Sequence, residues 1–250
     1  MSEIAIRLAV TPADYRACQI AQRAAWGITE DGYVLPVATM VGAQLHGGLV
    51  LGAFLPDGQA IGLSFAFLGR TEEGRTCFYS QLTGVVPEYQ AHGIGGKLKQ
   101  LQWRIARERG VDLVCWAFDP LQAGNAKFNL DNLGATSHRY LVDMYGPRTD
   151  TLNTGSPTDR LIVEWETQPD TYPNTIFEER RIEVPHAFNQ LRLGNSVEAD
   201  RWRLEVRHAF LDAFAKGFRA EGFEKIEGVE GPRCYYRLAR RSTIDSPTSR

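Results

Sequence analysis

The segment from Val85 to Leu98 constrains this chain most, because it places three glycines within four positions between an apolar, strand-like run and a helical run. Glycines leave little side-chain bulk over such a turn, so a ligand can reach the backbone amides. The free N–H groups of a helix's first turn and its positive dipole end favour an anion. The segment therefore predicts a strand-turn-helix unit that binds a phosphate or pyrophosphate, with a purely structural glycine turn as the alternative.

Two familiar phosphate-binding loops do not fit this segment. A P-loop needs Ser or Thr after its Gly-Lys pair, but Leu98 follows Lys97. A dinucleotide-binding turn needs Gly-x-Gly-x-x-Gly, and Leu98 also occupies the third glycine position of that pattern. The pattern that is present is Gln-x-x-Gly-x-Gly, formed by Gln90, Gly93 and Gly95.

The composition is typical of a soluble globular protein, since 43% of the 250 residues are hydrophobic and 23% are charged. The net charge of −2 gives no reason to expect nucleic acid or a membrane as a partner. No signal-peptide pattern or membrane-spanning apolar run is present, and no Cys/His cluster predicts a metal site. The four cysteines lack CxxC pairing, which favours free thiols and a cytoplasmic location.

Hydrophobic periodicity and turn signals predict an α/β core over residues 1–148. Thr11 followed by Pro12 is typical of a capped helix start. The expected helices cover residues 12–26, 36–45, 94–109 and 125–133. The expected strands cover residues 4–10, 49–54, 60–68, 76–86, 111–118 and 137–145. Three hairpin-linked strands followed by crossover helices predict a mixed, mostly antiparallel central sheet with helices on both faces.

A turn-rich, apolar-poor stretch at residues 149–160 is the expected linker to a second part of the chain. Residues 161–241 predict an α+β extension that packs on the first sheet. Its strands are expected at 161–166, 181–184, 223–229 and 234–238, with a long helix at 197–219. Residues 242–250 are expected to form a frayed tail.

The Gln90, Gly93 and Gly95 motif, with its preceding Val-x-Pro strand end, resembles the acyl-CoA-binding motif of the GNAT superfamily of N-acyltransferases. The order of elements over residues 4–146 is similar to the GNAT core. The segments 116–121 and 125–130 and the long C-terminal extension resemble a larger branch of predicted acetyltransferases. Some members of that branch are encoded near N-succinylamino acid racemases, so the resemblance suggests succinyl-CoA besides acetyl-CoA and an amino acid acceptor.

The resemblance implies a site for acyl-CoA along the segment before and after Pro87. The pyrophosphate would be held by backbone amides of the turn, and Gln90 would donate from its start; the turn residues are His92, Gly93, Ile94, Gly95 and Gly96. The pantetheine arm would pair with backbone groups of Leu82, Gly84 and Val86, as an added strand does. Lys97 and Lys99 are candidates for the phosphate charge, or else ordinary solvated lysines.

A second likeness places Asn125 where GNAT enzymes carry an asparagine that bonds the pantetheine, although a helix N-cap is an alternative role for it. The tyrosine that protonates the departing thiolate in many members is replaced by Leu130. An acceptor amine must still lose a proton near pH 7, which needs a nearby base. Candidate catalytic residues are Asp119, at the end of an expected strand, and Tyr140 and Tyr145 on the next one.

These inferences predict an acyl-CoA-dependent N-acyltransferase that moves an acetyl or succinyl group to a primary amine of a small molecule by direct attack. The cosubstrate would be acetyl-CoA or another acyl-CoA, with no metal. The missing tyrosine keeps a CoA-binding sensor without turnover as the alternative. The sequence leaves open the acyl group, the acceptor and whether the chain forms a homodimer.

Overall fold

The computed structural model describes residues 4–146, 157–168, 175–228 and 231–241. The chain forms two compact units. Unit 1 contains the described residues up to Trp116 together with Glu166–Gln168, and unit 2 contains the others. The division lies earlier in the chain than the boundary expected within residues 149–160, of which 149–156 lie outside the described residues, as does the expected tail.

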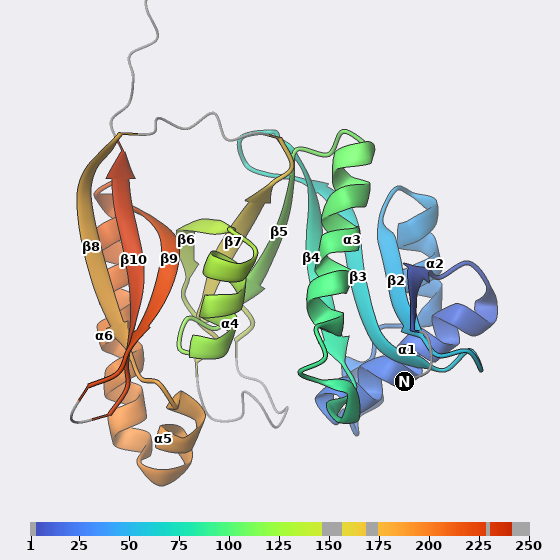
Figure 1. Cartoon of the computed structure of the whole chain (residues 1–250), viewed down its shortest axis with the longest axis horizontal. Helices are drawn as coiled ribbons and strands as arrows, with labels where there is room; N and C mark the ends of the chain where they lie inside the picture. Colours follow the sequence, from blue (N-terminus) through green and yellow to red (C-terminus); the bar gives the residue numbers. More distant parts are fainter. Residues whose placement is uncertain (1–3, 147–156, 169–174, 229–230, 242–250) are drawn as a thin grey trace, which may run out of the picture. The chain divides into compact units, whose positions relative to one another are not determined.

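Unit 1 is built on a sheet with the strand order β1-β2-β3-β4-β5 (Figure 1). Pairing is antiparallel from β1 to β4, and β4 pairs with β5 in parallel. The strands are β1 (Ala5–Leu8), β2 (Leu49–Phe54), β3 (Ala60–Arg70), β4 (Thr76–Val85) and β5 (Leu113–Phe118), of which β5 belongs to unit 1 as far as Trp116. This mixed sheet confirms the predicted fold class.

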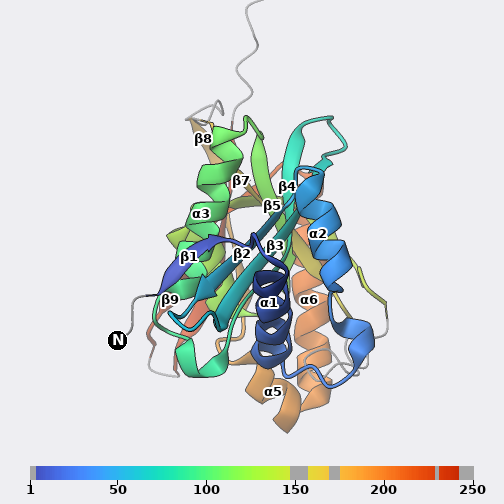
Figure 2. The same ribbon diagram turned by 90° about the vertical axis from the view of Figure 1, so that its right-hand side faces the viewer.

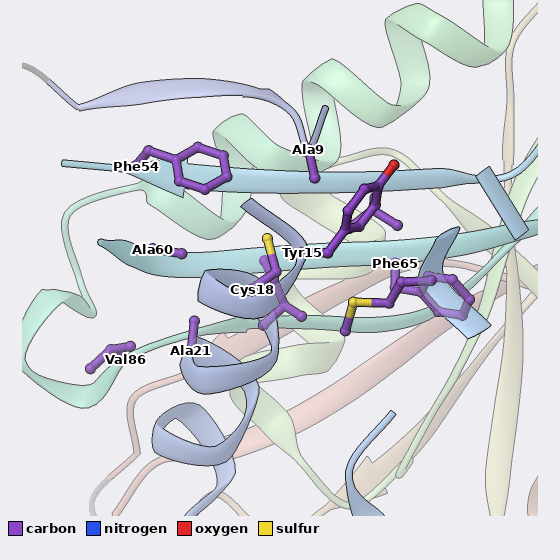
Figure 3. Close-up of a cluster of buried hydrophobic side chains, with 11 residues drawn as sticks. Ala9, Tyr15, Cys18, Ala21, Phe54, Ala60, Phe65 and Val86 are labelled. Atoms are coloured by element: carbon purple, nitrogen blue, oxygen red, sulfur yellow. The ribbon is translucent and has the colours of Figure 1, made fainter. Parts of the chain in front are cut away.

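Helices cover both faces of this sheet: α1 (Pro12–Trp26) and α2 (Val37–Leu45) lie on one face, and α3 (Ile94–Glu108) lies on the other (Figure 2). Helix α1 begins as predicted, since the Thr11 hydroxyl accepts from the Asp14 amide and the Asp14 carboxylate accepts from the Thr11 amide. On the α1 face, Tyr15 and Cys18 face the sheet and belong to a cluster of buried side chains that includes Phe54 and Phe65 (Figure 3). This apolar layer fixes α1 against the sheet.

Strand β4 carries an irregularity in its second half. Its register with β3 shifts between Phe65, which faces Leu82, and Ala66, which faces Ser80, so Gln81 is an extra residue in β4. The parallel ladder to β5 ends at the pair Tyr79 and Cys115, although β4 runs on to Val85. Among the described residues, therefore, the part of β4 after Tyr79 has no pairing with β5 along its β5-facing edge.

Unit 2 has the strand order β7-β6-β9-β10-β8, with antiparallel pairs β6–β7, β6–β9, β9–β10 and β10–β8. The strands are β6 (Thr136–Leu141), β7 (Arg160–Glu166), β8 (Ile176–Val184), β9 (Arg219–Ile226) and β10 (Arg233–Arg241), and β7 belongs to unit 2 as far as Trp165. The helices are α4 (Ala123–Lys127), which continues into a π-helical turn, α5 (Phe188–Gly194) and α6 (Ser196–Ala215).

The core of unit 2 is organised around Phe210 of α6, which is fully buried. Its ring stacks on Tyr140 at 5.7 Å and meets the edge of Tyr236 at 4.9 Å. Two expectations were wrong here, and one helix was missed. The long helix ends at Ala215 because Gly217 adopts a left-handed conformation and the chain re-enters a strand at Arg219. Helix α5 was not foreseen, and Tyr145 lies in a turn after β6 rather than on that strand.

In the described residues, no helix has the length and apolar character that crossing a membrane requires. The four cysteines are buried and unpaired with one another.

Candidate functional site

The turn between β4 and α3 is formed by a short 3-10 segment and two residues with left-handed backbone conformations. A short 3-10 turn at Pro87–Tyr89 leads into Ala91 and Gly93, which have left-handed φ values of 63° and 73°. The Gln90 side-chain amide donates to the Val85 carbonyl at 3.0 Å, so Gln90 braces the turn against the end of β4. The predicted strand-turn-helix unit is therefore present, but the Gln90 amide is bonded to protein rather than extended toward a ligand.

The first turn of α3 presents backbone amides with no side-chain cap. Gly93 occupies the N-cap position and cannot accept a hydrogen bond through a side chain. A Cβ atom at Gly93 would meet nothing within 4 Å, and one at Gly95 would meet only Val85 Cγ2 at 3.8 Å. These two glycines leave room beside the first turn of α3, whose backbone amides lie at the positive end of a 15-residue helix, the kind of position that binds phosphate groups.

The backbone of β4 offers a second set of polar groups, but not those expected. The Val86 amide donates to the Ile61 carbonyl at 2.9 Å, so it faces β3. Because backbone groups alternate between the two edges of a strand, the amides of Leu82 and Gly84 face β3 as well. The groups of Thr83 and Val85 face the edge that β5 leaves unpaired. The sequence therefore predicted the wrong alternate set of β4 residues for the pantetheine contacts, because no residue in it indicates which edge of the strand is free.

The two lysines of α3 differ in their surroundings. Lys97 is exposed in the first turns of the helix. Lys99 is only 4% exposed and points at the sheet, where its Nζ donates to Ser80 Oγ at 2.7 Å. Both alternatives expected for Lys99 were wrong, because its ammonium is buried between α3 and the sheet, neither at the helix N-terminus nor in solvent.

In unit 2, Asn125 is the third residue of α4 and is exposed, while Gln122 holds the N-cap position. The N-cap alternative for Asn125 was therefore wrong, and its contact with pantetheine stays a prediction. Leu130, at the position of the family tyrosine, is buried in the π-helical turn that follows α4.

Asp119 is tied to a buried arginine. Its two carboxylate oxygens accept from Arg203 at 2.8 and 3.0 Å, and one also accepts from the Leu121 amide. The Arg203 side chain is only 5% exposed, so the pair holds α6 to the segment after β5 within unit 2. A carboxylate that already neutralises a buried guanidinium is a poor base, and this geometry argues against the catalytic role expected for Asp119.

Tyr140 and Tyr145 have structural partners as well. The Tyr140 hydroxyl donates to Asp159 Oδ2 at 2.6 Å, and burial, followed by this bond, raises the pKa of Tyr140 well above its usual value. Arg207 donates twice to the same carboxylate at 2.9 Å. Tyr145 is 44% exposed and lies under the Arg160 guanidinium at 5.2 Å. Tyr140 is thus a core residue, and nothing in its surroundings favours proton transfer.

Comparisons with known proteins bear on the fold. A scan against protein-family models finds no match, and a search of curated proteins finds none. Among solved structures, a candidate acetyltransferase from Salmonella typhimurium with its cofactor acetyl-CoA matches with a TM-score of 0.54 and 20% identity, over 69% of this chain and 98% of that one. An N-acetyltransferase from Staphylococcus aureus matches with a TM-score of 0.53 and 14% identity, over 67% and 100% of the two chains.

The chain has the GNAT fold. This result confirms the fold expected from the Gln-x-x-Gly-x-Gly segment and the order of the elements. In the GNAT fold of this chain, the uncapped start of α3 comes directly after the strand whose far edge loses its partner. Both sets of backbone groups belong to unit 1, so one compact unit carries the backbone part of the candidate acyl-CoA site.

Proposed function

We propose that the protein is an acyl-CoA-dependent N-acyltransferase that moves an acetyl or succinyl group to the primary amine of a small molecule, with amino acids among the acceptors. The observation that carries this proposal is the adjacency of two features in unit 1. The first feature is the N-terminus of α3, which has no side-chain cap and is preceded by residues with left-handed conformations. The second is the edge of β4 that faces β5, where pairing with β5 ends at Tyr79. The first suits a pyrophosphate, and the second suits an amide-bearing arm.

The reaction needs few side chains if the two substrates are well placed. The acceptor nitrogen attacks the thioester carbonyl carbon directly, a C–N bond forms, and the C–S bond breaks to release CoA. The backbone N–H groups of Thr83 and Val85 are candidates to polarise the carbonyl oxygen as its negative charge develops. Alignment of the two reactants supplies a further part of the rate enhancement.

The variant Gly95→Val tests the phosphate-binding part of the site. A valine in the first turn of α3 places methyl groups where the proposal puts the pyrophosphate, while the Val85 contact of its Cβ is an ordinary 3.8 Å. The fold should therefore survive, and the Kd for CoA should rise at least tenfold, which corresponds to about 1.4 kcal/mol. Isothermal titration calorimetry with CoA measures this change.

Gly42→Val is the matched control, because Gly42 lies inside α2 with no atom within 4 Å of an added Cβ. It should bind CoA as the wild-type protein does. Equal CoA affinity in a folded Gly95→Val variant would contradict the proposed site.

A sensor that binds acyl-CoA without turnover is a second candidate. The burial of Leu130 at the tyrosine position and the bonded state of Asp119 and Tyr140 favour it. Thiol release from acetyl-CoA and succinyl-CoA, measured over a panel of small amines, separates the two functions. Release that depends on an amine supports the transferase, whereas CoA binding with no release for any amine supports the sensor.

A further inference from the structure

A closed ring of hydrogen bonds lies between α3 and the sheet of unit 1. Lys99 Nζ donates to Ser80 Oγ at 2.7 Å and to Gln102 Oε1 at 3.4 Å. Gln102 Nε2 donates to Ser64 Oγ at 3.3 Å, and the Thr83 hydroxyl lies 3.0 Å from Ser64 Oγ and 3.4 Å from Ser80 Oγ. Five polar side chains thus replace the apolar contacts that a helix normally makes on a sheet.

The extra residue in β4 is what assembles this ring. Side chains three positions apart in a regular strand point to opposite faces, so Ser80 and Thr83 would not meet. Because Gln81 is inserted between them, both face α3, where β3 supplies Ser64 opposite Thr83. The polar ring and the irregular strand are therefore one feature of the fold.

Lys99 is buried without a carboxylate partner in the described part of the chain. Burial lowers the pKa of Lys99 to about 7, and the nearby Cys115 thiol on β5 opposes this shift. From the sheet, Lys99 is contacted by the Ser80 hydroxyl of β4 and by the Trp116 ring of β5 at 3.8 Å, whereas Cys115 alternates with Trp116 along β5 and lies on its opposite face. A lysine so placed exchanges its proton near neutral pH.

The ring satisfies Lys99 in both protonation states. As an ammonium it has three N–H groups, which match Ser80, Gln102 and the face of Trp116. As an amine it has two N–H groups and one lone pair, which can accept from the Ser80 hydroxyl. Proton loss therefore leaves no buried polar group of the ring unpaired. An unpaired group would make the loss of the proton energetically costly.

The same residues mark the place where a thioester would lie. Ser80 directly follows Tyr79, the last residue of β4 in the ladder to β5. The pantetheine arm has about as many backbone bonds as four residues of a strand. An arm that starts at the turn after Val85 and runs back along β4 would thus bring its sulfur beside Gln81 and Leu82, next to Ser80.

We propose that Lys99 supplies the proton that the departing CoA sulfur receives, with the Ser80 hydroxyl as the relay between them. This inference rests on the proposed N-acyltransferase function. In this proposal Lys99, from α3, takes the role of the family tyrosine whose position is occupied by Leu130.

The proton balance closes without another reactant. When the C–S bond breaks, the thiolate takes a proton from Ser80 Oγ, and Ser80 takes one from Lys99 Nζ. The acceptor nitrogen loses one proton to water on forming the amide, and Lys99 regains one from water. A free thiol has a pKa of about 8.5, so proton transfer from Lys99 to the thiolate is downhill.

The variant Lys99→Met tests the role, because methionine fills the same volume without a titratable group. We expect a folded protein with unchanged Kd for CoA and at least a tenfold fall in kcat for thiol release. In the wild-type protein, kcat at saturating amine should fall as pH rises through about 7, since the donor form is lost. That decline should be absent in Lys99→Met and should not be restored by Lys99→Arg, whose side chain stays charged.

Arg104→Met is the control, since it removes a cation from the exposed face of the same helix. The titration of Lys99 is measured separately by NMR of protein labelled with ¹³C-lysine, with Lys99→Met to assign the signal. A signal that titrates near pH 7 is expected, and one that titrates above pH 9 overturns the proposal.

The outcomes separate the two proposals. A wild-type protein that binds no CoA refutes the transferase function, and this inference with it. A Lys99→Met variant that releases thiol at the wild-type rate, with the wild-type pH profile, refutes only the role of Lys99.

Discussion

Gly84 of β4 has a packing role that predicts a large effect of a single methyl group. A Cβ atom at this position would lie 2.4, 2.6 and 3.0 Å from three carbons of the Trp26 ring, at the end of α1. Without a clash, replacing a strand glycine with alanine stabilises a protein by about 0.5–1 kcal/mol through backbone entropy. Overpacking of this kind costs about 1–3 kcal/mol, so Gly84→Ala should lower the free energy of unfolding by about 1–2 kcal/mol.

A second substitution shows whether the clash is the cause. Trp26→Leu shortens the side chain that the new methyl group would meet, so Gly84→Ala should become neutral or stabilising in that background. The two changes should therefore couple by about 2 kcal/mol in a double-mutant cycle. Urea unfolding followed by circular dichroism gives each value, with equal m-values as the test that the transition stays two-state.

Gly69 of β3 is the matched control, since an added Cβ there would make an ordinary contact of 3.6 Å with Cys77. Gly69→Ala should not be destabilising. The reasoning would be refuted if Gly84→Ala were as stable as the wild-type protein, or if its effect were the same with leucine at position 26.

Two further changes test the local structure. Thr11→Ala removes the hydroxyl that caps α1 and should cost about 1 kcal/mol in urea unfolding, whereas Thr11→Ser should cost little; equal losses in both would contradict the cap. Arg207→Met leaves the fully buried Asp159 carboxylate without its guanidinium and should cost about 3 kcal/mol at pH 7. Burial raises the pKa of Asp159, but the bonds from Arg207 and Tyr140 outweigh it and lower that pKa. The loss of stability in Arg207→Met should therefore shrink below about pH 4, where the carboxylate of the variant is protonated. A loss that does not depend on pH would contradict the assignment.

Local signals in the sequence predicted the elements of unit 1 well. Thr11 and Pro12 fixed the start of α1, and the glycines after residue 92 fixed the start of α3, because capping and left-handed turns depend on residues next to one another. The same reasoning found the turn that carries the candidate phosphate site.

The side-chain partners could not be predicted in this way. Asp119 is neutralised by Arg203, which lies 84 positions later in the chain, and no local sequence pattern predicts that pair. Lys99 follows Leu98 in an amphipathic helix and reads as a solvated lysine. Only the register shift in β4 turns Ser80 toward it, and register depends on pairing between strands.

Strand β4 can tolerate changes of residue more easily than changes of length. Deleting Gln81 would restore regular alternation and turn over every side chain on its N-terminal side. Phe78, now fully buried on the α3 side, would exchange faces with Tyr79, and Ser80 would leave the lysine. A lineage that lost this one codon would have to rebuild both layers of unit 1 at once, so the length of β4 should be fixed more strictly than its composition.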